Sequence, residues 1–229
     1  MSYTNLINSM AATGIAEIIT LPICTIKTNY QNSNSNSIIG SAKDIYAKHK
    51  LMGFYKASFS AISSQMISTS FKYTIYRHLE DNKYNNKVVN GIISGIMTSM
   101  ITHPIDVIKI HRQMNASFIS EFKKVGLPLF YRGYSKSLTK VMISSSLFFP
   151  LYDYFKEHTS GSLSASFLSA TASTLIMSPV DYLKTRHIYN QPLYQGLNPV
   201  HYYKGLSINL LRIIPHFMIT MTIIDLLNK

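Results

Sequence analysis

One short block of sequence occurs three times in this chain of 229 residues, and this repeat constrains the fold more than any other feature. Each copy holds a proline with a lysine five residues later, and each follows a long apolar run. An aspartate stands two residues after the second and third prolines, whereas Cys24 holds that place in the first copy. The copies are LPICTIKTNYQ from Leu21, HPIDVIKIHRQ from His103 and SPVDYLKTRHI from Ser178. The repeat predicts three copies of one structural unit.

A second block follows each copy of the first, and it combines aromatic, basic and small residues. It reads FYKA from Phe54, FYRG from Phe130 and YYKG from Tyr202. Each copy opens another long, weakly polar stretch of helical length. The unit is therefore predicted as a helix, a short polar loop and a second helix. Three such repeats at 1–83, 84–158 and 159–229 would form one domain that covers 1–229.

Six segments are long enough to cross a bilayer, which takes about 20 residues of helix. They cover residues 4–31, 55–80, 88–115, 131–157, 162–188 and 204–227. None of them is purely apolar, and lipid cannot satisfy polar groups, so the polar side chains must face other helices or water. We therefore expect an all-α membrane protein with six transmembrane helices around a wet central cavity.

Composition and motifs argue against the other classes of protein. The net charge of +12 suits a nucleic-acid binder, but the basic residues recur at fixed places in each repeat and do not cluster on one face. The sequence has no nucleophile elbow, no glycine-rich phosphate loop and no HExxH motif, so it shows none of these signatures of an enzyme. His103, His111 and His187 do not have the spacing of a metal triad. We expect a transporter that is not an enzyme, with no cofactor, no bound metal and no nucleic-acid partner.

These blocks resemble the signature of the mitochondrial carrier family. That signature is a proline, an acidic residue and a basic residue on each odd-numbered helix, followed by an aromatic-basic-glycine element before each even-numbered helix. The resemblance covers nearly the whole chain, and it implies threefold pseudosymmetry, alternation between two open states and residence in the mitochondrial inner membrane as a monomer. The chain is short for this family, and its compactness and composition favour a divergent, virus-encoded member.

The resemblance implies that the charged residues after the prolines close the matrix side of the cavity. Asp106 should pair with Lys184 and Asp181 with Lys27, whereas Lys109 lacks an acid in this register. Two pairs in place of three predict a weak gate. The residues assigned to this matrix gate, including two bracing glutamines, are Lys27, Asp106, Lys109, Asp181, Lys184, Gln31 and Gln113.

The even-numbered helices should carry a second gate at the cytoplasmic side. In the family pattern an acid follows an aromatic residue, and a base stands three residues later; Asp153 and Lys156 follow this order. Arg77 and Glu80 reverse it, and Asp225 matches only in part. The resemblance therefore assigns these five residues to a cytoplasmic gate whose pairing stays open.

The cavity between the gates is predicted to be basic. A cation in the middle of a membrane costs several kcal/mol unless it has water or a partner, so such residues are functional candidates. Family contact positions on the even-numbered helices and nearby polar residues give the substrate-binding candidates Ser64, Gln65, Lys72, Lys140, Val141, Arg212 and Glu17.

These candidates favour an anionic cargo. Arg212 can grip a phosphate or carboxylate through two hydrogen bonds, and Val141 offers an apolar wall that suits a base. Nucleotides, including deoxynucleotides, are the preferred cargo. Glu17 either pairs with a cavity cation or carries a proton, and the second case would indicate a proton-coupled phosphate or carboxylate carrier. Cys24 and the reversed charges on the second helix leave open a carrier fold without transport.

The aromatic-basic elements resemble the cardiolipin sites of the family, where a basic side chain and a helix N-terminus hold a diphosphate headgroup. Ala57 replaces the first glycine, which predicts two good lipid sites and one weaker site. The lipid-binding candidates are Lys56, Arg132, Gly133, Lys204 and Gly205.

Overall fold

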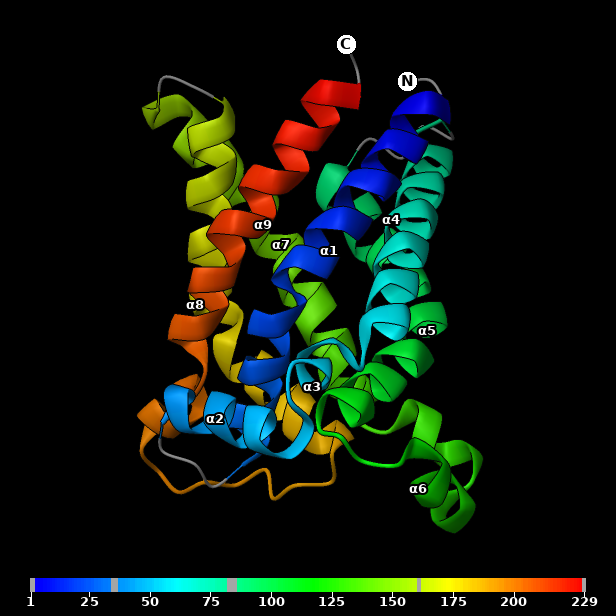
Figure 1. Cartoon of the computed structure of the whole chain (residues 1–229). Helices are drawn as coiled ribbons and strands as arrows, with labels where there is room; N and C mark the ends of the chain where they lie inside the picture. The colour runs from blue at the N-terminus through cyan, green and yellow to red at the C-terminus, as the bar shows by residue number, and fades with distance from the viewer. Residues whose placement is uncertain (1–2, 34–36, 82–85, 160–161, 228–229) are drawn as a thin grey trace.

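The computed structural model describes residues 3–33, 37–81, 86–159 and 162–227, and every regular element in these ranges is helical (Figure 1). The predicted all-α class is confirmed in this part of the chain. Six helices exceed 20 residues there: α1 (Tyr3–Asn32), α4 (Ser58–Asp81), α5 (Lys87–Gln113), α7 (Tyr134–His158), α8 (Ser162–Ile188) and α9 (Leu206–Leu227). They coincide with the six long segments predicted from the sequence.

The connections inside the first two repeats are not the short polar loops that were predicted. The first contains α2 (Ile38–His49) and α3 (Met52–Tyr55), and the second contains α6 (Phe118–Val125) and the 3-10 helix η1 (Leu127–Tyr131). Ser37 and Ser117 start α2 and α6, because their hydroxyls accept hydrogen bonds from backbone N–H groups of the first turn. The third connection has only η2 (Pro199–Tyr203).

The even-numbered segments begin later than predicted, at Ser58, Tyr134 and Leu206 in place of 55, 131 and 204. The aromatic-basic elements form the short turns α3, η1 and η2 ahead of the long helices. Gly133 and Gly205 separate the turns from the helices with left-handed φ angles of +76° and +91°, a conformation that L side chains rarely adopt. Close packing is a second reason for glycine at these places.

The six long helices form a closed ring of neighbours. Helix α1 packs against α4 and α9, α5 packs against α4 and α7, and α8 packs against α7 and α9. Both termini lie at one end of the bundle, while α2, α3 and α6 lie at the other end (Figure 1). A chain whose two termini lie at the same end of the bundle must run along the bundle an even number of times, as six long helices do.

The distribution of polarity is inverted relative to a soluble helical protein. Among the side chains that the structure describes, the buried ones are more often polar than apolar and include Ser94, Thr98 and Ser169, whereas large apolar residues such as Ile19 and Met100 are exposed. Two helices in the described residues, Met10–Asn32 and Val88–Gln113, are long and apolar enough to cross a membrane by length and composition alone.

Gly205 allows a direct test of this packing. A Cβ at Gly205 would lie 3.0 Å from Cγ of Gln31, whereas a Cβ at Gly196, which has the same φ of +91°, meets nothing within 4 Å. Gly205→Ala should therefore lower the unfolding temperature more than Gly196→Ala, which carries only the backbone strain of about 1–2 kcal/mol. Thermal unfolding of the two purified variants checks this. Equal losses would show that contact with Gln31 is unimportant.

Candidate functional site

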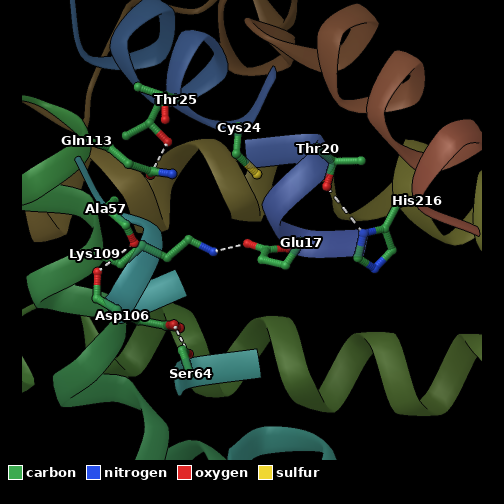
Figure 2. A network of polar contacts seen from close by, with 12 residues as sticks. Glu17, Thr20, Cys24, Thr25, Ala57, Ser64, Asp106, Lys109, Gln113 and His216 are labelled. Atoms are coloured by element: carbon green, nitrogen blue, oxygen red, sulfur yellow. Dashed lines mark hydrogen bonds and ion pairs between the residues drawn. The ribbon is translucent and has the colours of Figure 1, made fainter. Parts of the chain in front are cut away.

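Three carboxylates link the odd-numbered long helices to one another. The acids are Glu17 in α1, Asp106 in α5 and Asp181 in α8. Each forms an ion pair with a lysine on another odd-numbered helix. Lys27 pairs with Asp181, Lys184 with Asp106 at an N···O distance of 2.9 Å, and Lys109 with Glu17 at 2.6 Å. These six residues form a closed circuit through α1, α8 and α5, which we name the ion-pair ring. Figure 2 shows its Lys109–Glu17 pair.

Lys109 corrects one expectation. It was predicted to lack an acid because Cys24 holds the aspartate position, but the carboxylate of Glu17 takes that role from five residues before Pro22. The Glu17 side chain is only 1% exposed, so its charge requires cationic partners. Of the two readings of Glu17, the structure shows the ion-paired one, and the ring has three acids in place of two.

The even-numbered helices reach the same three acids. Each acid accepts one further hydrogen bond or ion pair from a substrate-binding candidate: Ser64 to Asp106 at 2.7 Å, Lys140 to Asp181, and Arg212 to Glu17 at 3.5 Å. Arg212 also donates to the sulfur of Cys24. The candidates on α4, α7 and α9 are thus tied directly to the ion-pair ring. Figure 2 shows Ser64 beside Asp106.

Two adjoining pockets share Lys140 and Ser144. The first, of about 210 Å³, is also lined by Lys72, Val141 and Lys184, so three of the candidates meet there. The second, of about 240 Å³, reaches Asp181 and Asn209. Neither is lined by Gln65, Arg212 or Glu17.

Positive charge exceeds negative charge in the ion-pair ring and its donors from the even-numbered helices. Five cations, namely the three ring lysines with Lys140 and Arg212, face the three ring carboxylates. Lys72 adds another cation at the wall of the first pocket. Such an excess attracts anions.

The two glutamines assigned to the matrix gate make no hydrogen bond to the ion-pair ring among the described contacts. Gln31 donates from its side chain to the backbone oxygen of Lys204 at 3.1 Å, and Gln113 accepts from the hydroxyl of Thr28 at 2.8 Å. They join neighbouring repeats beyond the ring, toward the end of the bundle that holds the short helices. The sequence pattern did not predict these partners of the two glutamines, because spacing along one helix does not show which groups of a neighbouring helix lie within hydrogen-bond distance.

Most of the predicted cytoplasmic gate lies outside the described side chains. This applies to Arg77, Glu80, Asp153 and Asp225. Lys156 is described, and it is exposed near the end of α7. The assignment of these five residues to a gate stays a prediction.

The lipid-binding candidates have different surroundings. Lys56 lines a pocket of about 360 Å³ together with Arg112 and Ser117. Arg132 forms an ion pair with Glu121 of α6. Lys204 donates to the backbone oxygen of Ser33 at 2.8 Å and lies over the Tyr30 ring. The two glycines of these elements are closely packed. A Cβ at Gly133 would lie 3.0 Å from the side chain of Ile188 in α8, and a Cβ at Gly205 would lie 3.0 Å from that of Gln31 in α1.

Sequence reasoning missed a cluster around Glu121. Its carboxylate binds Arg132 and lies 2.9 Å from Nε2 of His111, whose ring is fully buried. Burial raises the pKa of the Glu121 carboxyl, but hydrogen bonds to Arg132 and His111 outweigh it and hold that pKa below its ordinary value. A carboxyl with a lowered pKa stabilises the fold above its ordinary pKa, and this contribution is lost as the pH falls.

The Glu121 cluster predicts a pH-dependent stability difference. Glu121→Gln should cost about 1–2 kcal/mol at neutral pH, because charged hydrogen bonds are lost at a partly exposed site. The difference from the parent protein should shrink as the pH falls below the ordinary pKa of a glutamate, about 4.3, toward the lowered pKa of Glu121. Thermal unfolding between pH 3 and pH 8 measures this, with exposed Asp44→Asn in α2 as the control. A constant difference across that range would contradict the account.

Removing the charge of Glu17 should have a larger effect. Glu17→Gln keeps the size of the side chain but leaves Lys109 and Arg212 without their acid, which costs about 3–5 kcal/mol for a buried pair. We expect the unfolding temperature to fall by on the order of 10 °C. Glu157→Gln is the matched control, because Glu157 is exposed on α7. If both variants unfold at the same temperature, the ion-pair ring does not hold the helices together.

Comparison with known proteins identifies the family. A family model for the mitochondrial carrier protein matches residues 2–87 and 80–163. A mitochondrial carrier-like protein of Acanthamoeba polyphaga mimivirus is 59% identical over 229 residues, covering 99% of this chain and 97% of the relative. A mitochondrial substrate carrier family protein of Dictyostelium discoideum is 27% identical over 90% of this chain and 84% of the relative. The viral relative supports the expectation of a virus-encoded member. The chain belongs to the mitochondrial carrier family, whose members transport metabolites across a membrane.

Proposed function

We propose that this protein exchanges anionic metabolites across the mitochondrial inner membrane by alternating access, with nucleotides, including deoxynucleotides, as the preferred cargo. Family membership supports the transport of metabolites across a membrane. The closed ring of six long helices, with both termini at one end, supports six membrane spans with threefold pseudosymmetry in a monomer (Figure 1).

The observation that carries the proposal is the excess of cations in the ion-pair ring and its donors, to which Lys72 adds another cation at the wall of the first pocket. An anion with two or three negative charges would compensate the excess that the ring acids leave. A nucleoside diphosphate has that charge at neutral pH, because its terminal phosphate carries about 1.5–2 negative charges and its inner phosphate carries one. The Val141 side chain lines the same pocket as Lys140 and Lys72, which gives a base an apolar surface next to the cations.

The contacts also suggest how cargo binding opens the gate. Lys140 forms an ion pair with Asp181, and Arg212 forms one with Glu17. A phosphate that recruits these two side chains competes with the acids and weakens the ion-pair ring. Binding and gate opening would thereby be coupled through shared donors, because the cargo interacts with one state more favourably than with the other.

Lipid binding is part of the same proposal. Lys56 lies beside Ser117, whose hydroxyl caps the N-terminus of α6, so a phosphate there would meet both a cation and helix N–H groups. Lys204 and Arg132 occupy the equivalent turns of the other repeats. We propose that these turns hold cardiolipin, an abundant anionic lipid of the inner mitochondrial membrane.

Uptake by reconstituted protein tests the function. Liposomes preloaded with unlabelled nucleotide should take up labelled nucleotide, and Arg212→Ala should reduce the initial rate at least tenfold, because a charged hydrogen bond worth about 1.5–3 kcal/mol is lost. Lys124→Ala on the exposed face of α6 is the control for loss of one cation. Uptake without internal nucleotide would contradict exchange, and phosphate uptake driven by a pH gradient would indicate the proton-coupled alternative. No uptake of any anion would indicate a carrier fold without transport.

A further inference from the structure

The third repeat leaves a pocket at the end of the bundle that carries the short helices. Helix α2 covers the connection of the first repeat and α6 that of the second, but residues 189–198 of the third form no helix. A pocket of about 710 Å³ opens there between the ends of α1 and α8 and the turn η2. It is distinct from the pockets beside Lys140, with which it shares no lining residue.

The walls of this pocket are cationic and aromatic. Arg186, Lys204 and His201 line it, together with Tyr30 and Tyr182, and none of its described lining residues is acidic. The ring of Tyr182 lies 5.5 Å from the Arg186 guanidinium, and the ring of Tyr30 lies 4.7 Å from the Lys204 ammonium. Two permanent positive charges thus share one concave surface without a carboxylate.

Arg186 is the residue whose charge most needs a partner. Its side chain is buried, with 5% of the residue exposed, and it donates to two neutral carbonyl oxygens, those of Pro192 at 2.9 Å and Gln31 at 3.1 Å. No ion pair to Arg186 occurs among the described residues. A buried cation bound only by neutral groups retains a strong preference for an anion.

The other repeats show how this position is normally satisfied. Arg186 stands seven residues after its proline, where the first repeat has Asn29 and the second has His111. The asparagine is neutral, and it donates to the backbone oxygen of Gln113 at 2.7 Å. His111 meets the carboxylate of Glu121 on α6. The third repeat combines a permanent cation with the loss of the helix that would supply an acid.

Gln195 marks where that acid would stand. Its side-chain nitrogen donates to the Pro192 oxygen at 3.2 Å, the same atom that accepts from Nε of Arg186. The glutamine is therefore a close neighbour of the guanidinium and carries no charge. A ligand oxygen in this pocket can provide what the chain itself does not.

We propose that this pocket, formed by Arg186, Lys204, His201, Gln195 and the two tyrosines, is a second anion site that binds a phosphate or diphosphate group. Lys204 and Gly205 are shared with the predicted lipid site, but Arg186, which requires the anion, belongs to neither predicted site. A bound anion joins the ends of α1, α8 and α9, and it stabilises the state in which the ion-pair ring is closed. The phosphate can come from a soluble polyphosphate or from a lipid headgroup.

Gln195→Glu tests the site by supplying the missing acid. The carboxylate would neutralise Arg186 from within the chain, so the ligand-free variant should unfold at a higher temperature than the parent and bind anions at least tenfold more weakly. Asn198→Asp is the matched control, because it adds the same charge to the same connection, lies outside the pocket lining and keeps the oxygen that caps η2. Arg212→Ala removes a cation of the proposed cargo site, next to the ion-pair ring, and so separates the two sites.

The measurement is the unfolding temperature of each protein in phosphatidylcholine nanodiscs, titrated with inorganic pyrophosphate, and in nanodiscs that contain cardiolipin. Pyrophosphate should raise the unfolding temperature of the parent, Asn198→Asp and Arg212→Ala, but not that of Gln195→Glu. If cardiolipin alone gives this pattern, the anion is a lipid headgroup and the site stands. If Gln195→Glu and Asn198→Asp respond alike to both anions, or if all responses vanish in Arg212→Ala, the proposal is overturned.

Discussion

The rest of the structure depends on the ion pairs that three carboxylates inside the helical bundle form with cations of neighbouring helices. Each acid is held by one lysine from another odd-numbered helix and by one donor from an even-numbered helix. Isolated charges in such surroundings cost several kcal/mol each, so the helices keep their arrangement only while these partners stay together. The same charges that close the bundle therefore define what can open it.

Two hydrogen-bond donors beside the ion-pair ring can bind either a ring carboxylate or a cargo anion. Lys140 and Arg212 neutralise acids of the ring, and they are also cationic substrate-binding candidates that can bind an anion. A cargo anion and the ring acids cannot use the same hydrogen-bond donors fully at once. Competition of this kind provides a physical route from cargo binding to gate opening without a separate relay.

The sequence predicts much of this arrangement because helical spacing is regular. A lysine five residues after a proline has a fixed direction relative to it on the helix, and the resemblance to the mitochondrial carrier family supplied the partners, so the pairs Lys27–Asp181 and Lys184–Asp106 could be predicted. Glu17 lies outside that register, and its pairing with Lys109 depends on how α1 and α5 approach each other. The caps that start α2 and α6, and the isolation of Arg186, likewise depend on tertiary contacts that a single sequence does not display.

Hydrogen exchange at the end of α5, residues Val107–Gln113, tests the central claim most directly, because Lys109 joins this segment to the ion-pair ring. The experiment compares proteoliposomes that are exchanging nucleotide with the same proteoliposomes without nucleotide. Competition for Lys140 and Arg212 predicts faster amide exchange in this segment when nucleotide is present, because the ring opens more often. Unchanged or slower exchange during active uptake would show that cargo binding does not weaken the ring.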